Sequence, residues 1–278
     1  MKNKFSTLIC LLFVASALSS QVDSLQINYY ENYPYAYKEG TTLRGIELDI
    51  ITEYVNWLKQ KKNIIVEVSY KPYSEFGAFY NSIKSGGSKV VGLGSVTDNL
   101  ERAKEVVFSP PYLENLAVLI TDGSVPNIKS KDGIGVASVL NGMTGLVVSK
   151  SNHVAFMNNI KKLYDQTPRE GSGLTINTTE KQNNVIEAIA KDKKVFGYVD
   201  IVAYWAFVKA NPTKFLKIQK AFTERREYLG FIMPKKNAHS QYLSEFFESG
   251  FGFTSTKIYH QILEKYLGYE IIQSVEIK

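Results

Sequence analysis

Arg102 and Asp200 are the two charged residues with the strongest chemical potential in this sequence. Arg102 follows a short polar segment that contains Ser95 and Thr97, and Asp200 ends the apolar run at residues 195–200. An arginine can form two parallel, charge-assisted hydrogen bonds to a carboxylate, a geometry that lysine does not offer. The pattern alone leaves two interpretations open. Arg102 is either such an anion ligand or an exposed helix charge, and Asp200 is either a buried anion or a helix N-cap.

The sequence contains none of the common catalytic or metal-binding motifs. Its three histidines, His153, His239 and His260, lack the HExxH spacing and every other metal-ligand spacing, so we expect all three on helix surfaces. Neither a Gly-x-Ser-x-Gly elbow nor a P-loop or Rossmann fingerprint is present. These observations argue against an enzyme, and we expect no cofactor and no bound metal.

The composition is typical of a folded protein with a sizeable core. The chain has 278 residues, of which 44% are hydrophobic and 22% charged, which excludes an intrinsically disordered protein. The formal net charge of +6 is small for this length, and the basic residues are scattered. Nucleic acid is therefore not an expected partner. At this length we expect two lobes that fold without metal or disulfide.

The first 20 residues are typical of a cleaved signal peptide. Lys2 and Lys4 precede a mostly apolar stretch at residues 5–18, and residues 17–19 supply the small residues that signal peptidase requires. The apolar stretch is shorter than the roughly 20 residues of a membrane span. Cys10, the single cysteine, lies inside this stretch and not at its end, where a lipid anchor would need it. We therefore expect an exported, periplasmic protein without disulfides.

Hydrophobic periodicity alternates between strand-like and helix-like along the first part of the chain. Strands are expected at residues 25–30, 66–70 and 90–93, with helices between them at 48–58 and 75–85. This β-α-β-α-β order is typical of a mostly parallel sheet that is covered by helices and joined by right-handed crossovers.

The rest of the chain continues the alternation, so the predicted fold class is α/β. The segment from Thr179 to Gln182 has the form of a capping box that would start a helix. The expected elements are, in order, a strand at 133–138, a helix at 154–164, the helix after Gln182, a strand at 195–201, a helix at 204–209, strands at 215–218 and 228–233, and helices at 240–248 and 256–266.

Several segments, in order along the chain, carry a family resemblance. The most specific is Gly94-Ser95-Val96-Thr97, followed by Glu101-Arg102-Ala103-Lys104 and by Phe108-Ser109-Pro110-Pro111-Tyr112. The others are an aromatic and proline-containing loop at 32–37, a helix start at 43–50, the strand at 195–200, and the residues Gly252-Phe253-Thr254 before Lys257-Ile258-Tyr259. Together they resemble the bacterial extracellular solute-binding proteins of family 3, which serve the ABC importers of polar amino acids.

The resemblance implies a two-lobed, type II periplasmic binding protein-like fold. Each lobe would be a mostly parallel sheet covered by helices, and two segments of the chain would cross between the lobes. We expect lobe 1 at residues 21–120 and 225–278, and lobe 2 at 121–224. The crossings would lie near residues 116–121 and 223–228. Small ligands bind beyond the carboxyl ends of strands in such sheets.

The resemblance also implies which residues bind a solute. Arg102 and Asp200 would hold the carboxylate and the ammonium group of an amino acid, and the backbone N–H groups and hydroxyls of Ser95 and Thr97 would complete the carboxylate cradle. The chain has two residues more between Thr97 and Arg102 than the family's usual spacing. This difference leaves open whether Arg102 points into the site.

Four further residues match ligand-facing positions of the family. Tyr33, Tyr35 and Tyr73 would cover the solute as aromatic platforms. Thr144 would supply a hydroxyl from lobe 2 at the N-terminus of a helix. From the residues alone, each tyrosine fits the core or the surface equally well, and Thr144 fits an ordinary helix cap.

The function implied by the resemblance is transport. We expect a monomeric, exported solute-binding protein that captures an amino acid or a related small polar solute by hinge closure and delivers it to a membrane importer permease. Two alternatives stay open on the same fold: an exported dehydratase that acts on prephenate or arogenate, and a ligand-sensing module. The chain stops at Lys278 without a later membrane span or catalytic domain, which favours a free binding protein.

Overall fold

The computed structural model describes residues 21–167 and 173–268, without the side chains of residues 225 and 226. The predicted signal peptide at residues 1–20 lies outside the described residues. Within the described ranges, no helix combines the length and apolar character needed to cross a membrane.

Eleven strands occur in the described part of the chain. They are β1 (Gln21–Tyr30), β2 (Tyr37–Glu39), β3 (Thr42–Arg44), β4 (Ile64–Tyr73), β5 (Val90–Thr97), β6 (Val107–Phe108), β7 (Leu113–Asp122), β8 (Thr144–Val148), β9 (Thr175–Thr179), β10 (Val195–Asp200) and β11 (Leu216–Met233). Nine of them form one sheet in the order β4-β1-β5-β11-β7-β10-β8-β9, with β6 beside β11, and β2 and β3 form a separate hairpin.

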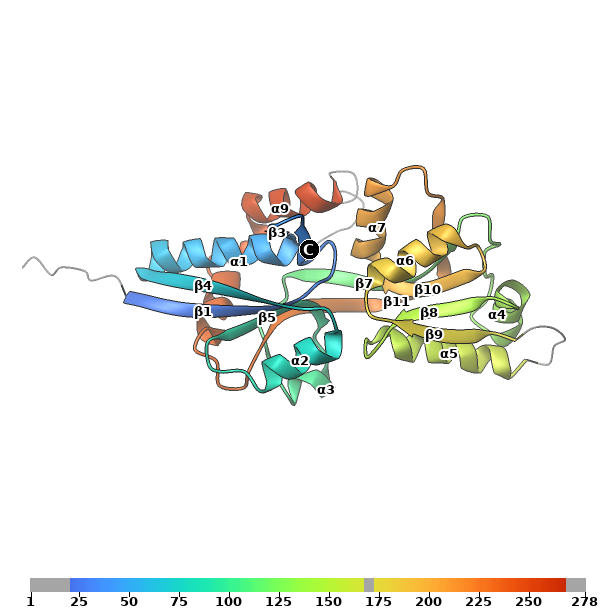
Figure 1. Cartoon of the computed structure of the whole chain (residues 1–278), viewed down its shortest axis with the longest axis horizontal. Helices are drawn as coiled ribbons and strands as arrows, with labels where there is room; N and C mark the ends of the chain where they lie inside the picture. Colours follow the sequence, from blue (N-terminus) through green and yellow to red (C-terminus); the bar gives the residue numbers. More distant parts are fainter. Residues whose placement is uncertain (1–20, 168–172, 269–278) are drawn as a thin grey trace, which may run out of the picture.

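Helices cover this sheet on both faces (Figure 1). The α-helices are α1 (Ile46–Trp57), α2 (Phe76–Lys84), α3 (Leu100–Ala103), α4 (Gly133–Leu140), α5 (His153–Asp165), α6 (Gln182–Lys191), α7 (Ile201–Ala210), α8 (Ser240–Glu248) and α9 (Lys257–Leu267). A π-helical turn, η1 (Leu58–Lys62), continues α1, and a 3-10 turn, η2 (Phe253–Ser255), precedes α9.

Parallel pairing occupies both ends of the sheet, and antiparallel pairing occupies its middle. β4, β1 and β5 are parallel at one end, and β10, β8 and β9 are parallel at the other. β7 and β11 run antiparallel to each other and connect the two ends. We call the end with β1 the first half and the end with β10 the second half (Figure 1). The predicted α/β architecture is thereby confirmed.

Each half has apolar clusters on both faces of its part of the sheet. In the first half, α1, α8 and α9 pack on one face around residues such as Ile50 and Leu263, and α2 covers the other face with Phe79. In the second half, α4 and α5 cover one face, and α6 and α7 cover the other. Complete burial of a large apolar side chain contributes about 1.5–3 kcal/mol, so these clusters hold the strand ends firmly in place.

The strands that join the halves are longer than the sequence suggests. Residues 223–228, where we expect a crossing between two strands, belong to β11, which runs through 18 residues without a break. Its pairing with β7 shifts register between Ile218 and Thr223 and again between Thr223 and Arg226. Such shifts bend a strand locally. The predicted lobe boundaries beside these crossings stay a prediction.

The predicted strand at residues 133–138 is wrong, because these residues form helix α4. The side chain of Asp132 accepts a hydrogen bond from the backbone N–H of Gly135 at 2.7 Å and so caps the helix. The alternation of glycine with Ile134 and Val136 imitates a strand. In the helix, Val136 and Leu140 lie one turn apart and are both buried.

Candidate functional site

A small cavity lies where the two halves meet, at the carboxyl ends of four strands. Tyr30, Thr97, Val148 and Asp200 are the last residues of β1, β5, β8 and β10, and all four line the cavity. Its volume is about 40 Å³. The full lining comprises Tyr30, Asn32, Phe76, Gly94, Ser95, Thr97 and Arg102 from the first half, and Val148, Ser151, Asn152, His153, Gln182 and Asp200 from the second.

Asp200 is the most densely bonded residue of the site. Its backbone N–H donates to Oε1 of Gln182 at 2.7 Å. Its Oδ1 accepts from the amide of Asn115 at 2.7 Å and lies 3.3 Å from Nε2 of His153. Its Oδ2 accepts from the amide of Gln182 at 2.5 Å and from the Tyr35 hydroxyl at 3.4 Å. Asp200 occupies the N-cap position of α7, as one interpretation of the sequence expects, but its side chain makes no capping hydrogen bond.

Asp200 and His153 form a buried ion pair. Burial raises the pKa of Asp200, but the hydrogen bond and charge of His153, together with donors from Gln182 and Asn115, outweigh burial and hold this pKa below its usual range. Burial lowers the pKa of His153, yet the hydrogen bond to Asp200 and the charges of Asp200 and Glu227 raise it overall. Both shifts favour the charged forms, an imidazolium beside a carboxylate.

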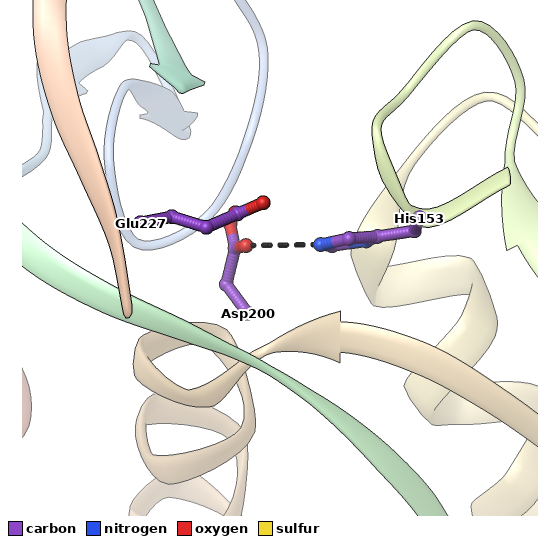
Figure 2. Close-up of side chains that lie close together, drawn as sticks. All are labelled: His153, Asp200 and Glu227. Carbon is purple, nitrogen blue, oxygen red and sulfur yellow. Dashed lines mark ion pairs between the residues drawn. The ribbon is translucent and has the colours of Figure 1, made fainter. Parts of the chain in front are cut away.

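Glu227 brings a second carboxylate close to this pair. It lies on β11 directly opposite Asn115 of β7. Its Oε2 accepts a hydrogen bond from the Thr97 hydroxyl at 3.1 Å, and its Oε1 faces the amide of Asn152 at 3.5 Å. Burial is the main reason that the pKa of Glu227 is raised. Figure 2 shows the imidazole of His153 pointing toward the carboxylates of Asp200 and Glu227.

These three residues are the group in the described chain that could hold a metal ion. Their candidate ligand atoms lie within 4.8 Å of one another. Each oxygen of Asp200, however, is already close to two protein donors, and a carboxylate offers about four acceptor positions in total. The arrangement therefore fits an ion pair with a neighbouring carboxylate better than a metal centre.

Arg102 reaches the cavity from the short helix α3. The side chain of Asn99 caps this helix by accepting from the backbone N–H of Arg102 at 2.9 Å. The guanidinium donates to the carbonyl oxygen of Thr97 at 3.2 Å and lies over the Phe76 ring at 5.3 Å. Burial lowers the pKa of Arg102, although Tyr80 and Glu227 partly offset that effect. An arginine remains charged after such a shift.

The guanidinium of Arg102 has no carboxylate within ion-pair distance among the described residues. Despite the longer spacing between Thr97 and Arg102, Arg102 lines the cavity, and Asn99 between them caps α3. Among the described residues, the half-buried guanidinium therefore feels the charge of Glu227 but forms no ion pair with it.

Ser95 and Thr97 line the cavity, but their polar groups are partly engaged. The Ser95 hydroxyl accepts from the amide of Asn32 at 3.0 Å, and its backbone N–H donates to Oε1 of Glu47 at 3.0 Å. The same oxygen accepts from the Tyr112 hydroxyl at 2.6 Å. Glu47 therefore orients the end of β5, and the Ser95 N–H is not free to cradle a solute, contrary to expectation.

None of the three candidate tyrosines lines the cavity. Tyr35 is fully buried beneath the site, where its hydroxyl faces Asp200. Tyr33 packs edge-on against Tyr37 at 4.9 Å and does not line the cavity, and Tyr73 packs against Phe79 at 6.3 Å.

The expected position of Thr144 is wrong, because it begins β8 and not a helix. Its hydroxyl faces that of Thr175 at 3.2 Å, and Thr144 does not line the cavity. The helix after β8 is α5. It begins at the cavity with His153.

Residues 25–269 match the family model of the bacterial extracellular solute-binding proteins, family 3. The chain belongs to this family. The family resemblance found in the sequence is confirmed. The match also supports a general ligand-binding role for this chain.

Solved structures share the fold of this family 3 member at low sequence identity. The arginine-, lysine- and histidine-binding protein ArtJ from Geobacillus stearothermophilus has 20% identity and a TM-score of 0.65, over 88% of this chain and 96% of that one. The GluR0 ligand-binding core from Nostoc punctiforme, solved with L-glutamate, has 13% identity and a TM-score of 0.66, over 88% and 100%.

A third structure, a periplasmic binding protein of Salmonella typhimurium with high arginine specificity, has 16% identity and a TM-score of 0.66, over 88% and 99%. These likenesses confirm the predicted two-lobed, type II fold, in which the halves are the lobes. No curated protein matches the chain.

The sequence interpretation missed the histidine of this family 3 site. We expected His153 and His239 on helix surfaces, but their exposed fractions are 4% and 1%. Nδ1 of His239 lies 2.8 Å from the Tyr54 hydroxyl, and neither residue lines the cavity. Only a short turn separates His153 from the end of β8. Recognition of β8 as a strand would have placed His153 at the site.

Gln182 also takes a different role from the one predicted. A capping box would direct its side chain back to the chain just before its helix, but the N-cap of α6 is Lys181 and has no side-chain cap. The Gln182 side chain instead bonds both the backbone and the carboxylate of Asp200. Its amide serves the site and not the helix start.

Proposed function

We propose that this chain is an exported solute-binding protein that captures an amino acid or a related small polar solute between its halves. It then delivers the solute to an ABC importer in the membrane. Family membership supports the ligand-binding part of the proposal. The amino acid ligands of the ArtJ and GluR0 structures support the solute class. The single observation that carries the proposal is the polar cavity at the strand ends, which residues of both halves line.

Capture is proposed to involve a hinge movement. A cavity of about 40 Å³ holds only a few water molecules, so the halves must separate to admit a solute. The contacts between the halves include the Tyr30 hydroxyl, which donates to the carbonyl oxygen of Glu180, and Lys181, which pairs with Glu31 at 2.8 Å. The register shifts between β7 and β11 supply a place where the connection can bend.

Arg102 is proposed as the ligand of a solute carboxylate. Its charge is partly desolvated, it lines the cavity, and a bidentate carboxylate would replace the water that its guanidinium has lost. Each charge-assisted hydrogen bond of this kind contributes about 1.5–3 kcal/mol. Ser95 and Thr97 lie beside it on β5 and are proposed to limit the shape of the site.

A thermal-shift screen of the purified chain tests this function. Amino acids and the corresponding simple carboxylic acids are added one at a time, and we expect at least one to raise the melting temperature. Arg102→Ala should abolish that rise. Lys104→Ala, which removes an exposed cation two residues away that pairs with Glu101, is the matched control and should keep it. Equal shifts in both variants would contradict the assignment of Arg102.

Export and closure need separate measurements. The periplasmic fraction should contain the chain with its new N-terminus near residue 21, as N-terminal sequencing would show. Small-angle X-ray scattering should give a smaller radius of gyration once the solute is added. An unprocessed chain that remains in the cytoplasm would contradict the proposed export.

One observation favours the dehydratase alternative. Glu227 is a buried carboxyl group with a raised pKa, which is a property of general acids. It does not line the cavity, however, and Thr97 and Asn152 occupy its oxygens. We therefore propose that the chain is not an enzyme, and incubation with prephenate or arogenate should give no turnover.

A further inference from the structure

Three charged side chains line the cavity, namely Arg102, His153 and Asp200, and Asp200 is the one carboxylate among the described lining residues. A buried ammonium group needs a carboxylate with free acceptor positions, because an unpaired buried cation is strongly disfavoured. The occupancy of the Asp200 oxygens therefore decides whether this cavity can receive an ammonium group.

Protein donors occupy both oxygens of Asp200. Asn115 and His153 face Oδ1 at 2.7 and 3.3 Å, and Gln182 and Tyr35 face Oδ2 at 2.5 and 3.4 Å. A carboxylate has about four acceptor positions, and here four donors are directed to them. A solute ammonium group would have to displace one donor and leave a buried amide, hydroxyl or imidazole without its partner.

His153 gives Asp200 a cation from the chain itself. It begins α5 in the second half, and Asp200 ends β10 in the same half, so separation of the halves leaves this pair in place. Both side chains are 5% exposed. The imidazole thus neutralises the carboxylate that lines the cavity before any solute enters.

The remaining charge of the cavity attracts an anion. The guanidinium of Arg102 has no carboxylate partner among the described residues. The backbone N–H groups of Asn152 and His153, which both line the cavity at the start of the 13-residue helix α5, have no hydrogen-bond partner within the described ranges. Free N–H groups at a helix N-terminus favour negative charge. Nδ1 of His153 is also buried without a partner, and an imidazolium would offer it as a further donor.

We propose that the solute is a small organic anion that carries no ammonium group beside its carboxylate. Arg102 and the start of α5 bind the carboxylate, and His153 takes the place that an ammonium group would need. This inference rests on the proposed solute-binding function and names its solute class. Glu227 offers no substitute for Asp200, because it does not line the cavity and bonds Thr97 instead.

Matched solutes that differ only in the ammonium group test this proposal. Isothermal titration calorimetry at neutral pH compares L-alanine with pyruvate, L-leucine with 4-methyl-2-oxopentanoate, L-phenylalanine with phenylpyruvate, and L-glutamate with 2-oxoglutarate. We expect at least one oxo acid to bind about tenfold or more tightly than its amino acid. An amino acid that binds more tightly than its oxo acid overturns this inference but supports the proposed function. Absence of binding by all eight probes overturns both.

Two histidine variants identify the selective group. His153→Ala frees one acceptor position of Asp200, so the preference for the oxo acid should fall about tenfold or more. His260→Ala removes an exposed histidine and should keep the wild-type preference. Circular dichroism confirms that both variants are folded. An unchanged preference in a folded His153→Ala variant overturns the role of His153, and the wild-type comparison stands if that variant does not fold.

Discussion

Nε2 of His153 lies 3.3 Å from Oδ1 of Asp200, and this contact ties the first residue of α5 to the last residue of β10. Both elements point into the cavity between the halves. The pair therefore sets the charge of the site and also holds two walls of the second half together. Its loss should be visible in stability as well as in binding.

We predict that His153→Ala lowers the free energy of unfolding by about 3–5 kcal/mol, because it leaves the buried charge of Asp200 without its cation. Urea denaturation at pH 6 measures this change. His260→Ala, at an exposed position, should stay within about 0.5 kcal/mol of the wild type. A loss for His153→Ala as small as that of the control would show that the two groups are not paired.

The same pair predicts a pH dependence of stability. Burial lowers the pKa of His153 in the folded state, but the hydrogen bond to Asp200 and its charge outweigh burial and raise this pKa overall. Its contribution is therefore complete below the ordinary histidine pKa of about 6.5 and is lost as the pH rises through the folded-state pKa. The stability difference between the wild type and His153→Ala should shrink between pH 6 and pH 9. A constant difference over this range would contradict the prediction.

Glu47 should make stability fall over a lower range of pH. Burial raises its pKa to about 7, although bonds from Tyr112, Ser95 and Gly94 oppose that effect. The folded state thus binds a proton that the unfolded state releases above about pH 4.5, so stability declines from there to about pH 7. The decline due to this group amounts to about 3 kcal/mol. Glu47→Gln, which keeps an acceptor oxygen but cannot ionise, should remove it in urea titrations at several pH values.

Gly45→Ala should destabilise the loop that carries Tyr35. Gly45 has a φ of +140°, and an added Cβ would lie 2.0 Å from the carbonyl oxygen of Tyr35. We expect a loss of at least about 1–3 kcal/mol from the backbone conformation, with the clash in addition. Gly87→Ala is the matched control, because its Cβ would meet open space. Thermal or urea unfolding of the two variants would show whether they differ as expected.

Tyr30→Phe should favour the separated halves. The mutation removes the hydroxyl that bonds the carbonyl oxygen of Glu180 across the cavity. A hydrogen bond contributes about 1 kcal/mol, so the equilibrium should move about fivefold toward separation. Small-angle scattering without solute should then give a larger radius of gyration. The control is Tyr70→Phe, because Tyr70 is 43% exposed, and it should leave the radius of gyration unchanged. The same radius of gyration for both variants would show that the Tyr30 contact does not hold the halves together.

Most of the longer helices were predictable because alternating periodicities extend over long stretches of the chain, whereas strands β7, β8 and β9 were not among the expected elements. The strands around residues 25–30 and 195–200 agree closely with β1 and β10. Errors arose where local patterns are ambiguous. The glycines around Ile134 give a helix the alternation of a strand. The crossing expected near residues 223–228 lies inside β11, which continues because β7 supplies its hydrogen bonds.

The candidate site was predictable where a single segment carries the signal. Arg102 and Asp200 were read from local motifs, and the structure brings both to one cavity. His153 was not, because its importance depends on a partner 47 positions away, beyond the reach of any spacing argument. Tyr33 and Tyr73 do not line the cavity, because each ring packs against an aromatic ring of the first half. Direct contact of any of these residues with a solute stays a prediction.

The path of the chain through β7 and β11 has a consequence for the order of folding. The second half is built from one contiguous stretch, whereas the first half starts with β1 and ends with α9. Strand β5 pairs with β11, and Thr97 is opposite Leu229, so the first half cannot close its sheet until nearly the whole chain has emerged. A chain that crosses a membrane from its N-terminus would therefore complete its middle portion first. Its opening strands would lack β11, α8 and α9 until the end of the chain follows, and α1 and α2 alone would cover them in that interval.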